Sequence, residues 1–173
     1  FILVKSPDKK LYAKALKEAA RALLFLSPRL KKKSVFYIDY MEMIAPLSLR
    51  LAEVLRSKNT DLLYMNNQPS SNLEGILAAR DTGIHCIQHA RIEVKLNKIE
   101  AEAVNRNVEK VICVSRGVLD TLVKSGVRPD KCAVVYNGIA ASLRPETRPE
   151  DVKKSLSIGP DAFVVGTVGS LVK

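Results

Sequence analysis

Tryptophan is absent from this chain of 173 residues, and aromatic residues make up only 5% of it. All-β sandwiches and propellers carry recurrent aromatic core positions, so the composition favours an α/β or an all-α fold. No apolar run approaches the roughly 20 residues that a helix needs to cross a bilayer. The opening segment, FILVKSPDKK, becomes charged too soon for a signal peptide.

Cysteine is also scarce. The 3 cysteines, Cys86, Cys113 and Cys132, lie in or beside apolar runs and lack paired CxxC spacing. We expect them to be small core residues of a reduced, cytoplasmic protein rather than zinc or redox ligands.

Several catalytic patterns are missing. The sequence contains no Ser-His-Asp spacing, no G-x-S-x-G motif, no matched pair of carboxylates and no Cys/His cluster. Hydrolysis by a resident nucleophile is therefore unsupported, and we expect neither a metal site nor a cofactor. All 8 glycines lie at Gly75 or later. A nucleotide-binding fold normally carries a glycine-rich turn after its first strand, because glycine lets the backbone approach phosphate closely. The absence of such a turn here means either that a nucleotide would bind at a different site or that the beginning of the fold is missing.

Basic residues are abundant, with 28 Lys and Arg against 18 Asp and Glu, and the formal net charge is +10. Such a charge favours polyanionic partners: nucleic acid, anionic lipid or a phosphorylated small molecule. Aromatic residues interleaved with basic ones, zinc-finger spacing and a helix-turn-helix signal are all missing, so we expect no nucleic-acid partner.

From about Thr60 the sequence alternates between two patterns. Apolar runs typical of buried strands occupy Leu62 to Met65, Ile84 to Ile87, Val111 to Val114, Ala133 to Tyr136 and Phe163 to Val168. Helical patterns separate them at Leu73 to Arg80, Ile92 to Asn105, Gly117 to Ser125 and Glu150 to Ser157. Strands apolar on both faces that alternate with helices predict a parallel sheet covered on both sides. The expected fold class is α/β, a Rossmann-like doubly wound sheet.

Capping residues agree with this pattern. Gly83 and Gly126 each follow a predicted helix, where a left-handed glycine ends helices. Ser115 opens the helix after Val114 and can accept a hydrogen bond from its free N–H groups. Before Thr60, FILV and SVFYIDY are interpreted as strands, and Lys9 to Leu26 and Met43 to Arg56 as helices.

Ligands of open parallel sheets bind beyond the carboxyl ends of the strands, so the residues there are candidates for function. These ends carry mainly uncharged polar groups, which suit a hydroxyl-rich ligand: Asn66, Asn67, Gln68, Gln88, His89, Arg91, Ser115, Asn137, Gly138, Gly169 and Ser170. Structural alternatives stay open. The segment Asn66 to Asn72 could be a turn that caps the next helix, and a backbone carbonyl could satisfy His89. His85 lies inside a strand and is interpreted as structural.

The predicted helix Lys9 to Leu26 has two faces. Its apolar side holds Tyr12, Ala15, Leu16, Ala19, Leu23 and Leu26, and its basic stripe holds Lys10, Lys14, Lys17 and Arg21, flanked by Leu24 and Phe25. Cations beside bulky apolar residues are typical of a helix on an anionic membrane surface. The alternative is a solvated face with Leu24 and Phe25 packed against other chain segments.

Four stretches together resemble the family 4 retaining glycosyltransferases of GT-B fold. They are TDLLYMNN, GIHCIQHARI, VEKVICVSRGVLDTLVKSGVRPDKCAVVYNGI and VVGTVGSLVK, which span Thr60 to Lys173 in the family's order. The resemblance implies two Rossmann-like domains facing a cleft, with the acceptor on the N-terminal domain and the nucleotide sugar on the C-terminal one. His89 matches a family histidine near the transferred sugar. Asn137 and Gly138 match the segment that leads into the linker, and Gly169 matches a glycine near the donor phosphates.

The sequence also departs from the family pattern. Ser170 stands where an arginine usually follows the glycine, Asn66 and Asn67 where histidines are frequent, and Ala140 where aspartate is common. The donor-site lysine and paired glutamates would lie beyond Lys173. We therefore expect residues 1–140 to form the acceptor-side domain and residues 141–173 a linker with the start of the donor domain, and we expect this fragment alone to be inactive.

The resemblance implies transfer of a hexose from a nucleotide diphosphate sugar to an acceptor hydroxyl with retention, in cell-surface polysaccharide or glycolipid synthesis. His89 is the expected catalytic residue; Asn66, Asn67, Gln68, Gln88, Arg91 and Ser115 are expected to bind the acceptor; Asn137, Gly138, Gly169 and Ser170 are expected to line the cleft. The protein would be cytoplasmic, with the inner membrane face as a further candidate partner. The alternative is a non-catalytic basic Rossmann-like module that binds anionic membrane or a phosphorylated partner.

Overall fold

In the computed structural model of the chain, the structure describes residues 2–8, 10–138 and 147–166. The chain divides into two compact units, residues 1–137 and 138–173, which are considered separately. The first unit contains α1 (Leu11–Leu23), α2 (Pro28–Asp39), a π-helical segment (Tyr40–Ile44), α3 (Ala45–Ser57), β1 (Leu62–Asn66), a 3-10 turn (Pro69–Ser71), α4 (Leu73–Thr82), β2 (His85–Ala90), α5 (Lys98–Asn107), β3 (Lys110–Cys113), α6 (Arg116–Lys124), a 3-10 turn (Pro129–Lys131) and β4 (Cys132–Val134). The second contains α7 (Pro149–Ser155).

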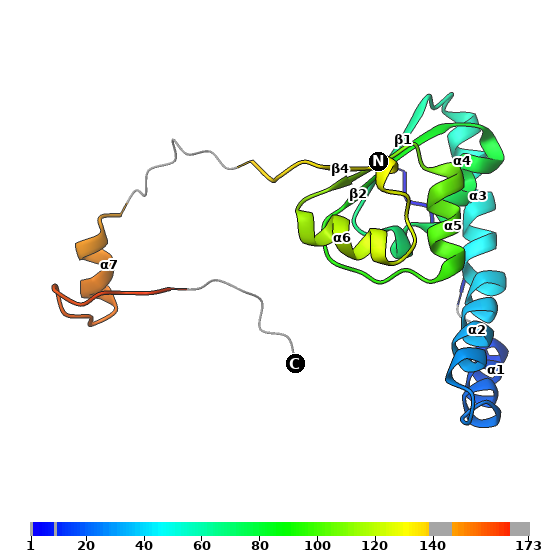
Figure 1. The fold of residues 1–173 in the computed structure, drawn as a ribbon, viewed down its shortest axis with the longest axis horizontal. Helices are drawn as coiled ribbons and strands as arrows, with labels where there is room; N and C mark the ends of the chain where they lie inside the picture. Colours follow the sequence, from blue (N-terminus) through cyan, green and yellow to red (C-terminus); the bar gives the residue numbers. More distant parts are fainter. Residues whose placement is uncertain (1, 9, 139–146, 167–173) are drawn as a thin grey trace. The chain divides into compact units, whose positions relative to one another are not determined.

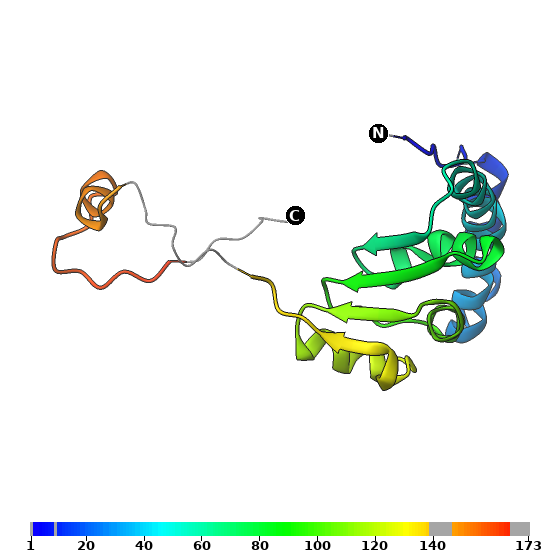
Figure 2. The same ribbon diagram turned by 90° about the horizontal axis from the view of Figure 1, so that it is seen from above.

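The sheet has four parallel strands in the order β1-β2-β3-β4, so each strand pairs with the next one along the chain. Figure 2 shows the four arrows side by side and pointing the same way. The α/β class and the parallel sheet predicted from the sequence are confirmed.

Three helices connect these strands and pack on one face of the sheet. Right-handed crossovers between strands in chain order place every connecting helix on the same side. One core cluster accordingly joins alternate strand residues to the inner faces of α4, α5 and α6: Met65, Cys86, Val111 and Cys113 with Ile76, Val104, Val118 and Leu122. On the other face, Tyr64 of β1 is 51% exposed and His89 of β2 is half-buried. The described strands contain no reversal of order that would place helices on that second face.

Cysteines occupy the positions expected of them. Cys86 and Cys113 are buried, Cys132 is half-buried, and all three are free thiols. Burial raises the pKa of the Cys86 thiol to about 11, so it stays protonated at neutral pH.

Glycine caps end two helices as predicted. Gly83 (φ +71°) and Gly126 (φ +99°) both lie in the left-handed region that L side chains rarely adopt. Residues 135–138 follow β4 without a turn, and Gly138 has no left-handed φ.

The segment before β1 differs most from the sequence prediction. SVFYIDY was predicted as a strand, but it lies in α2 and the following π-helical segment. Pro28 begins α2 with a preset φ, and Phe36 lies one turn from Tyr40, with ring centroids 6.4 Å apart. FILV was also predicted as a strand, and residues 2–4 form none.

A proline explains the π-helical segment between α2 and α3. Pro46 has no N–H and cannot donate to the carbonyl of Glu42 one turn earlier. The helix widens before it, and the Ala45 N–H reaches back to the carbonyl of Tyr40 instead. Figure 1 shows α2 and α3 continuing through this segment as one long helix.

The apolar face predicted for α1 is not buried. Tyr12, Leu16 and Leu23 are 50%, 52% and 81% exposed, whereas Ala13 is buried. The small Ala13 side chain lets α1 lie close to α2, and Lys17 on this inner face pairs with Asp39 of α2 at 2.7 Å. We call α1, α2 and the segment between them the helical hairpin.

The second unit is described for residues 147–166 alone. The prediction of a strand over Phe163 to Val168 fails for residues 163–166, which adopt no strand. An isolated extended segment has no ladder to join, and Phe163 and Val165 are 94% and 84% exposed. Val168, Gly169 and Ser170 lie outside the described residues, as does the predicted domain boundary at 140.

Candidate functional site

The carboxyl ends of the parallel strands meet at one edge of the sheet. The pairing register places Asn66, the last residue of β1, opposite His89 of β2. The next pair places His89 opposite Ile112 of β3, directly before Cys113, Val114 and Ser115. This edge therefore brings Asn66, His89 and Ser115 together from three separate stretches of the sequence.

His89 is held by a residue that the sequence analysis did not single out. The Tyr64 Oη lies 2.7 Å from His89 Nδ1, and the two rings meet edge to face with centroids 6.0 Å apart. A tyrosine hydroxyl both donates and accepts, so Tyr64 donates to Nδ1 when the His89 ring proton resides on Nε2 and accepts from Nδ1–H in the other tautomer. A strand's side-chain period of two places Tyr64 and Asn66 on the same face, which is the signal that could have identified Tyr64.

Gln88 fixes the loop that follows β1. Its side chain is fully buried, and its Nε2 donates to the carbonyls of Asn67 at 2.9 Å and His89 at 3.0 Å. Its Oε1 accepts from Asn72 Nδ2 at 3.0 Å, and the same Asn72 amide also donates to the carbonyl of Asn66. Both the oxygen and the nitrogen of the Gln88 side-chain amide are hydrogen-bonded within the chain. Gln88 therefore stabilises the loop that carries the site.

The loop leaves Asn66 and Asn67 exposed at the sheet edge. Asn67 has a φ of +96°, a region in which asparagine is the most tolerated residue after glycine. Asn72 precedes α4 without a side-chain cap hydrogen bond, so the capping alternative considered for this segment is not what the structure shows. Gln68 is half-buried and donates to Ser71 Oγ at 2.9 Å.

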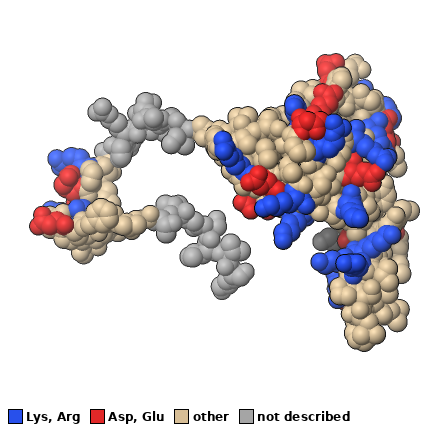
Figure 3. All heavy atoms as spheres, viewed as in Figure 1, with Lys and Arg blue, Asp and Glu red and all other residues tan. Residues whose placement is uncertain are grey.

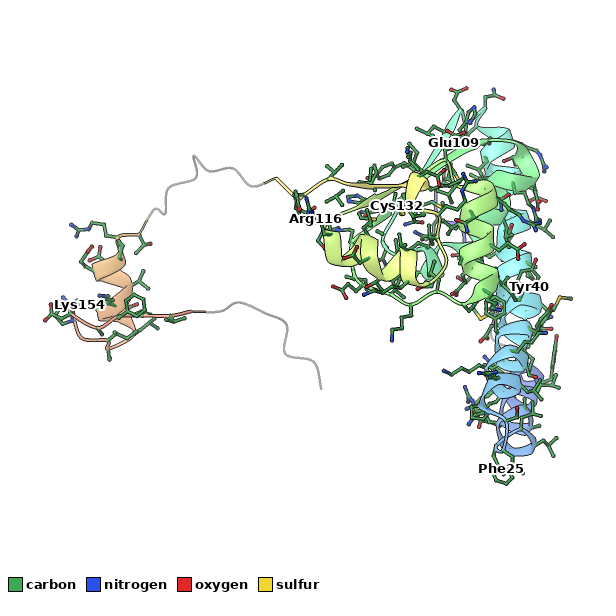
Figure 4. The ribbon with its side chains drawn as sticks, in the orientation of Figure 1. Phe25, Tyr40, Glu109, Arg116, Cys132 and Lys154 are labelled. Atoms are coloured by element: carbon green, nitrogen blue, oxygen red, sulfur yellow. The ribbon has the colours of Figure 1, made fainter. Side chains whose placement is uncertain are left out.

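The N-terminus of α6 lies at the same edge. Ser115 caps it as predicted, its Oγ accepting from the Val118 N–H at 3.2 Å. Arg116, labelled in Figure 4, lies at the end of the sheet toward which the strands point. Glu93 also reaches this turn: its carboxylate accepts from Thr121 Oγ1 at 3.3 Å and occupies the space that a Cβ on Gly117 would fill. Sequence reasoning missed Glu93, whose only signal is its place shortly after β2.

A carboxyl group with a shifted pKa lies close to this loop. Glu74 belongs to the first turn of α4, and burial raises the pKa of its carboxyl above the usual value.

The remaining predicted residues at this edge follow β2 and β4 and are exposed: Arg91, Asn137 and Gly138. Their ligand roles stay predictions.

The residues predicted to face a membrane have several different surroundings. The pKa of Lys10 is raised by its hydrogen bond with Tyr12 and by its pairing with Glu42. Lys17 pairs with Asp39, and Arg21 with Glu18. Lys14 and Phe25 are exposed, whereas Leu24 is half-buried. The six residues thus do not form one free stripe.

Metal-ligand clusters and membrane-spanning helices are both absent from the described residues. Residues 2–8, 10–138 and 147–166 contain no group of three His, Cys, Asp or Glu side chains that could hold a metal ion. The described helices all fall short of the length and apolar character needed to cross a membrane.

The model of the family described as Glycosyltransferase Family 4 matches residues 7–143. The chain belongs to this glycosyltransferase family. The match covers the helical hairpin, the complete four-stranded sheet and the candidate site edge. No curated protein matches the chain significantly.

Solved structures of similar fold include glycosyltransferases. The crystal structure of Anabaena Alr3699/HepE in complex with UDP and glucose has a TM-score of 0.52 at 21% identity and covers 65% of this chain and 31% of that chain. The same protein in complex with UDP-glucose has a TM-score of 0.52 at 17% identity, over 88% of this chain and 47% of that chain. A glycosyltransferase from Rickettsia africae ESF-5 has a TM-score of 0.52 at 18% identity, over 68% of this chain and 33% of that chain. The chain described here therefore spans less than half the length of each of these solved glycosyltransferase-like structures.

Proposed function

We propose that this chain provides the acceptor side of a GT-B glycosyltransferase that moves a hexose from a nucleotide diphosphate sugar to an acceptor hydroxyl with retention. The family match over residues 7–143 carries the proposal. It is supported by the neighbouring Anabaena structure, which is a complex with UDP-glucose.

The sheet edge has the chemistry that such an acceptor needs. Sugar hydroxyls both donate and accept hydrogen bonds, and the exposed amides of Asn66 and Asn67 offer both functions side by side. In the tautomer in which Tyr64 donates to Nδ1, the Nε2–H of His89 is available as a donor to the transferred sugar or the acceptor. We assign His89 this role and Tyr64 a positioning role.

The N-terminus of α6 adds a second element. Its free N–H groups and Arg116 form a positive end at the strand edge, where a hydroxyl-bearing or anionic group binds favourably. In retaining transfer without a protein nucleophile, groups of this kind stabilise the charge that develops on the leaving diphosphate. Glu93 lies against the same turn and partly offsets this positive charge.

The test uses the complete gene product and measures the transfer of sugar from UDP-sugars to hydroxyl acceptors. We expect His89→Ala to lower turnover by about 100-fold, the scale of losing one well-placed hydrogen-bond donor. His85→Ala is the matched control, since His85 lies on the same strand but at its start, where it pairs with Glu109. Equal turnover in the two variants would show that His89 is not in the reaction site.

A further inference from the structure

The end of the helical hairpin exposes a cluster of large apolar side chains. Leu23, Phe25 and Leu26 are 81%, 67% and 84% exposed. Figure 4 shows Phe25 at the far end of the hairpin, pointing away from the helices. We call Leu23, Phe25 and Leu26 the apolar tip.

A basic groove extends from the helical hairpin to the start of α5. It has a volume of about 1030 Å³ and is lined by two cationic groups that flank the tip in sequence, Arg21 and Arg29, together with Lys31, Lys32, Lys33 and Lys98. The one carboxylate among its lining residues is Asp39, which is paired with Lys17 at 2.7 Å. The groove therefore has a large excess of positive charge over a short distance.

Aromatic side chains also contribute to the groove. Phe36 and Tyr37 line it and meet edge to face, with ring centroids 6.5 Å apart. With Ile99 they also line an adjoining pocket of about 370 Å³ between α2, α4 and α5. The groove thus joins a cationic surface to an apolar one.

We propose that the helical hairpin docks on an anionic lipid bilayer, with the apolar tip entering the interface and the basic groove binding lipid phosphates. Charge complementarity selects the anionic headgroups, and exposed leucine and phenylalanine side chains gain free energy only where an apolar phase accepts them. A nucleic acid would neutralise the cations but leave the apolar tip in water. The space-filling view shows Lys and Arg on the hairpin near the sheet unit and an uncharged far end (Figure 3).

The surface differs from the one that the sequence predicted. Lys10 and Lys17 are engaged with Glu42 and Asp39, so the exposed cations come mainly from the start of α2 and from Lys98. The proposal does not depend on sugar transfer, because binding to vesicles needs no substrate.

The first experiment measures co-flotation of the chain with phosphatidylcholine vesicles with and without phosphatidylglycerol. We expect binding to the anionic vesicles alone, weakened by high salt. Replacing Lys31, Lys32 and Lys33 by Gln should weaken partitioning by on the order of 100-fold, since each basic residue near an anionic surface contributes about fivefold. The control replaces Lys58, Lys124 and Lys154 by Gln, which removes the same charge from exposed positions elsewhere. Equal loss in both variants would overturn the assignment of the groove.

The second experiment tests the apolar tip. Phe25→Ser with Leu26→Ser changes no charge and alters exposed positions, so folding, checked by circular dichroism, should be preserved. We expect weaker binding to anionic vesicles, because two apolar side chains no longer enter the interface. Unchanged vesicle binding would contradict tip insertion. Displacement of the chain by soluble glycerol phosphate at the same phosphate concentration would show a small-molecule phosphate site and refute bilayer docking.

Discussion

The phenol oxygen of Tyr64 in β1 lies 2.7 Å from Nδ1 of His89 in β2, across neighbouring parallel strands. This bond sets which ring nitrogen of His89 remains free. The candidate site therefore depends on a residue two positions before the strand end as well as on the residues after it.

Removing the Tyr64 hydroxyl should alter the tautomer of the His89 imidazole and leave the fold intact. In Tyr64→Phe we expect the ¹⁵N signals of His89 to move toward a mixture of tautomers, because Nδ1 loses its hydrogen-bond partner. The free energy of unfolding should fall by no more than about 1.5 kcal/mol, the scale of one hydrogen bond. Two-dimensional NMR of the ring nitrogens measures this, with His85 as the internal reference. Unchanged His89 signals would mean that the bond does not set its tautomer.

Replacement of Gln88 should destabilise the chain. Gln88→Leu leaves the Asn67 carbonyl and one Asn72 proton without their partner in a partly buried place, which costs about 1–3 kcal/mol. Urea unfolding measures this loss. Asn137→Ala, at an exposed position past β4, should stay within about 0.5 kcal/mol of the parent chain. A Gln88 variant as stable as the Asn137 variant would refute its role in holding the loop.

The cap of α6 offers a test with two substitutions at one position. Ser115→Ala removes the acceptor of the Val118 N–H and should cost about 1 kcal/mol. Ser115→Gly should cost only a few tenths of a kcal/mol, because glycine is itself tolerated at this position. Thermal unfolding compares the two. If both variants lose the same stability, the loss arises from something other than the cap.

Glu74 predicts a pH dependence of stability. Its folded pKa is raised by burial above the ordinary value of 4.5, so the folded state binds the proton more tightly than the unfolded state. The free energy of unfolding therefore falls as the pH rises from below 4.5 through the folded pKa, and the loss remains at neutral pH. Glu74→Gln should be more stable than the parent at neutral pH, and this difference should shrink in acid.

Urea unfolding at several pH values measures the effect of Glu74. Glu53→Gln, at an exposed position of α3, corrects for the loss of a negative charge. A stability difference for Glu74→Gln that does not vary with pH, after this correction, would contradict the burial argument.

The sequence predicted the part of the fold where local signals agree. From β1 to β4, apolar runs, Gly83 and Gly126 and the Ser115 cap all indicate the same βα units, and the structure has them. Before β1, the two predicted helices are present as α1 and α3, but the strands predicted at FILV and SVFYIDY are not, because aromatic and β-branched residues suit a strand as well as a helix. Here the contacts between α1 and α2 decide the outcome, including the Lys17–Asp39 pair. No local pattern reveals such contacts.

The candidate site was predicted only in part for a related reason. Residues that follow strands can be read from the sequence, and His89, Asn66 and Ser115 do meet at one edge. Tyr64 and Glu93 reach the edge through the strand register and through the path of the loop after β2. Both are tertiary properties, set by how neighbouring segments pair and not by spacing along the chain.

The chain order of the strands has a consequence for how the protein is made. Each of β2, β3 and β4 pairs with the strand synthesised just before it, so none of them waits for a partner encoded further along. The sheet can therefore grow strand by strand as the ribosome releases the chain, with each new helix covering one face of the strands already formed. A circular permutation that starts the chain at β3 would remove that advantage for the pairing of β2 with β3 while keeping every contact of the finished sheet.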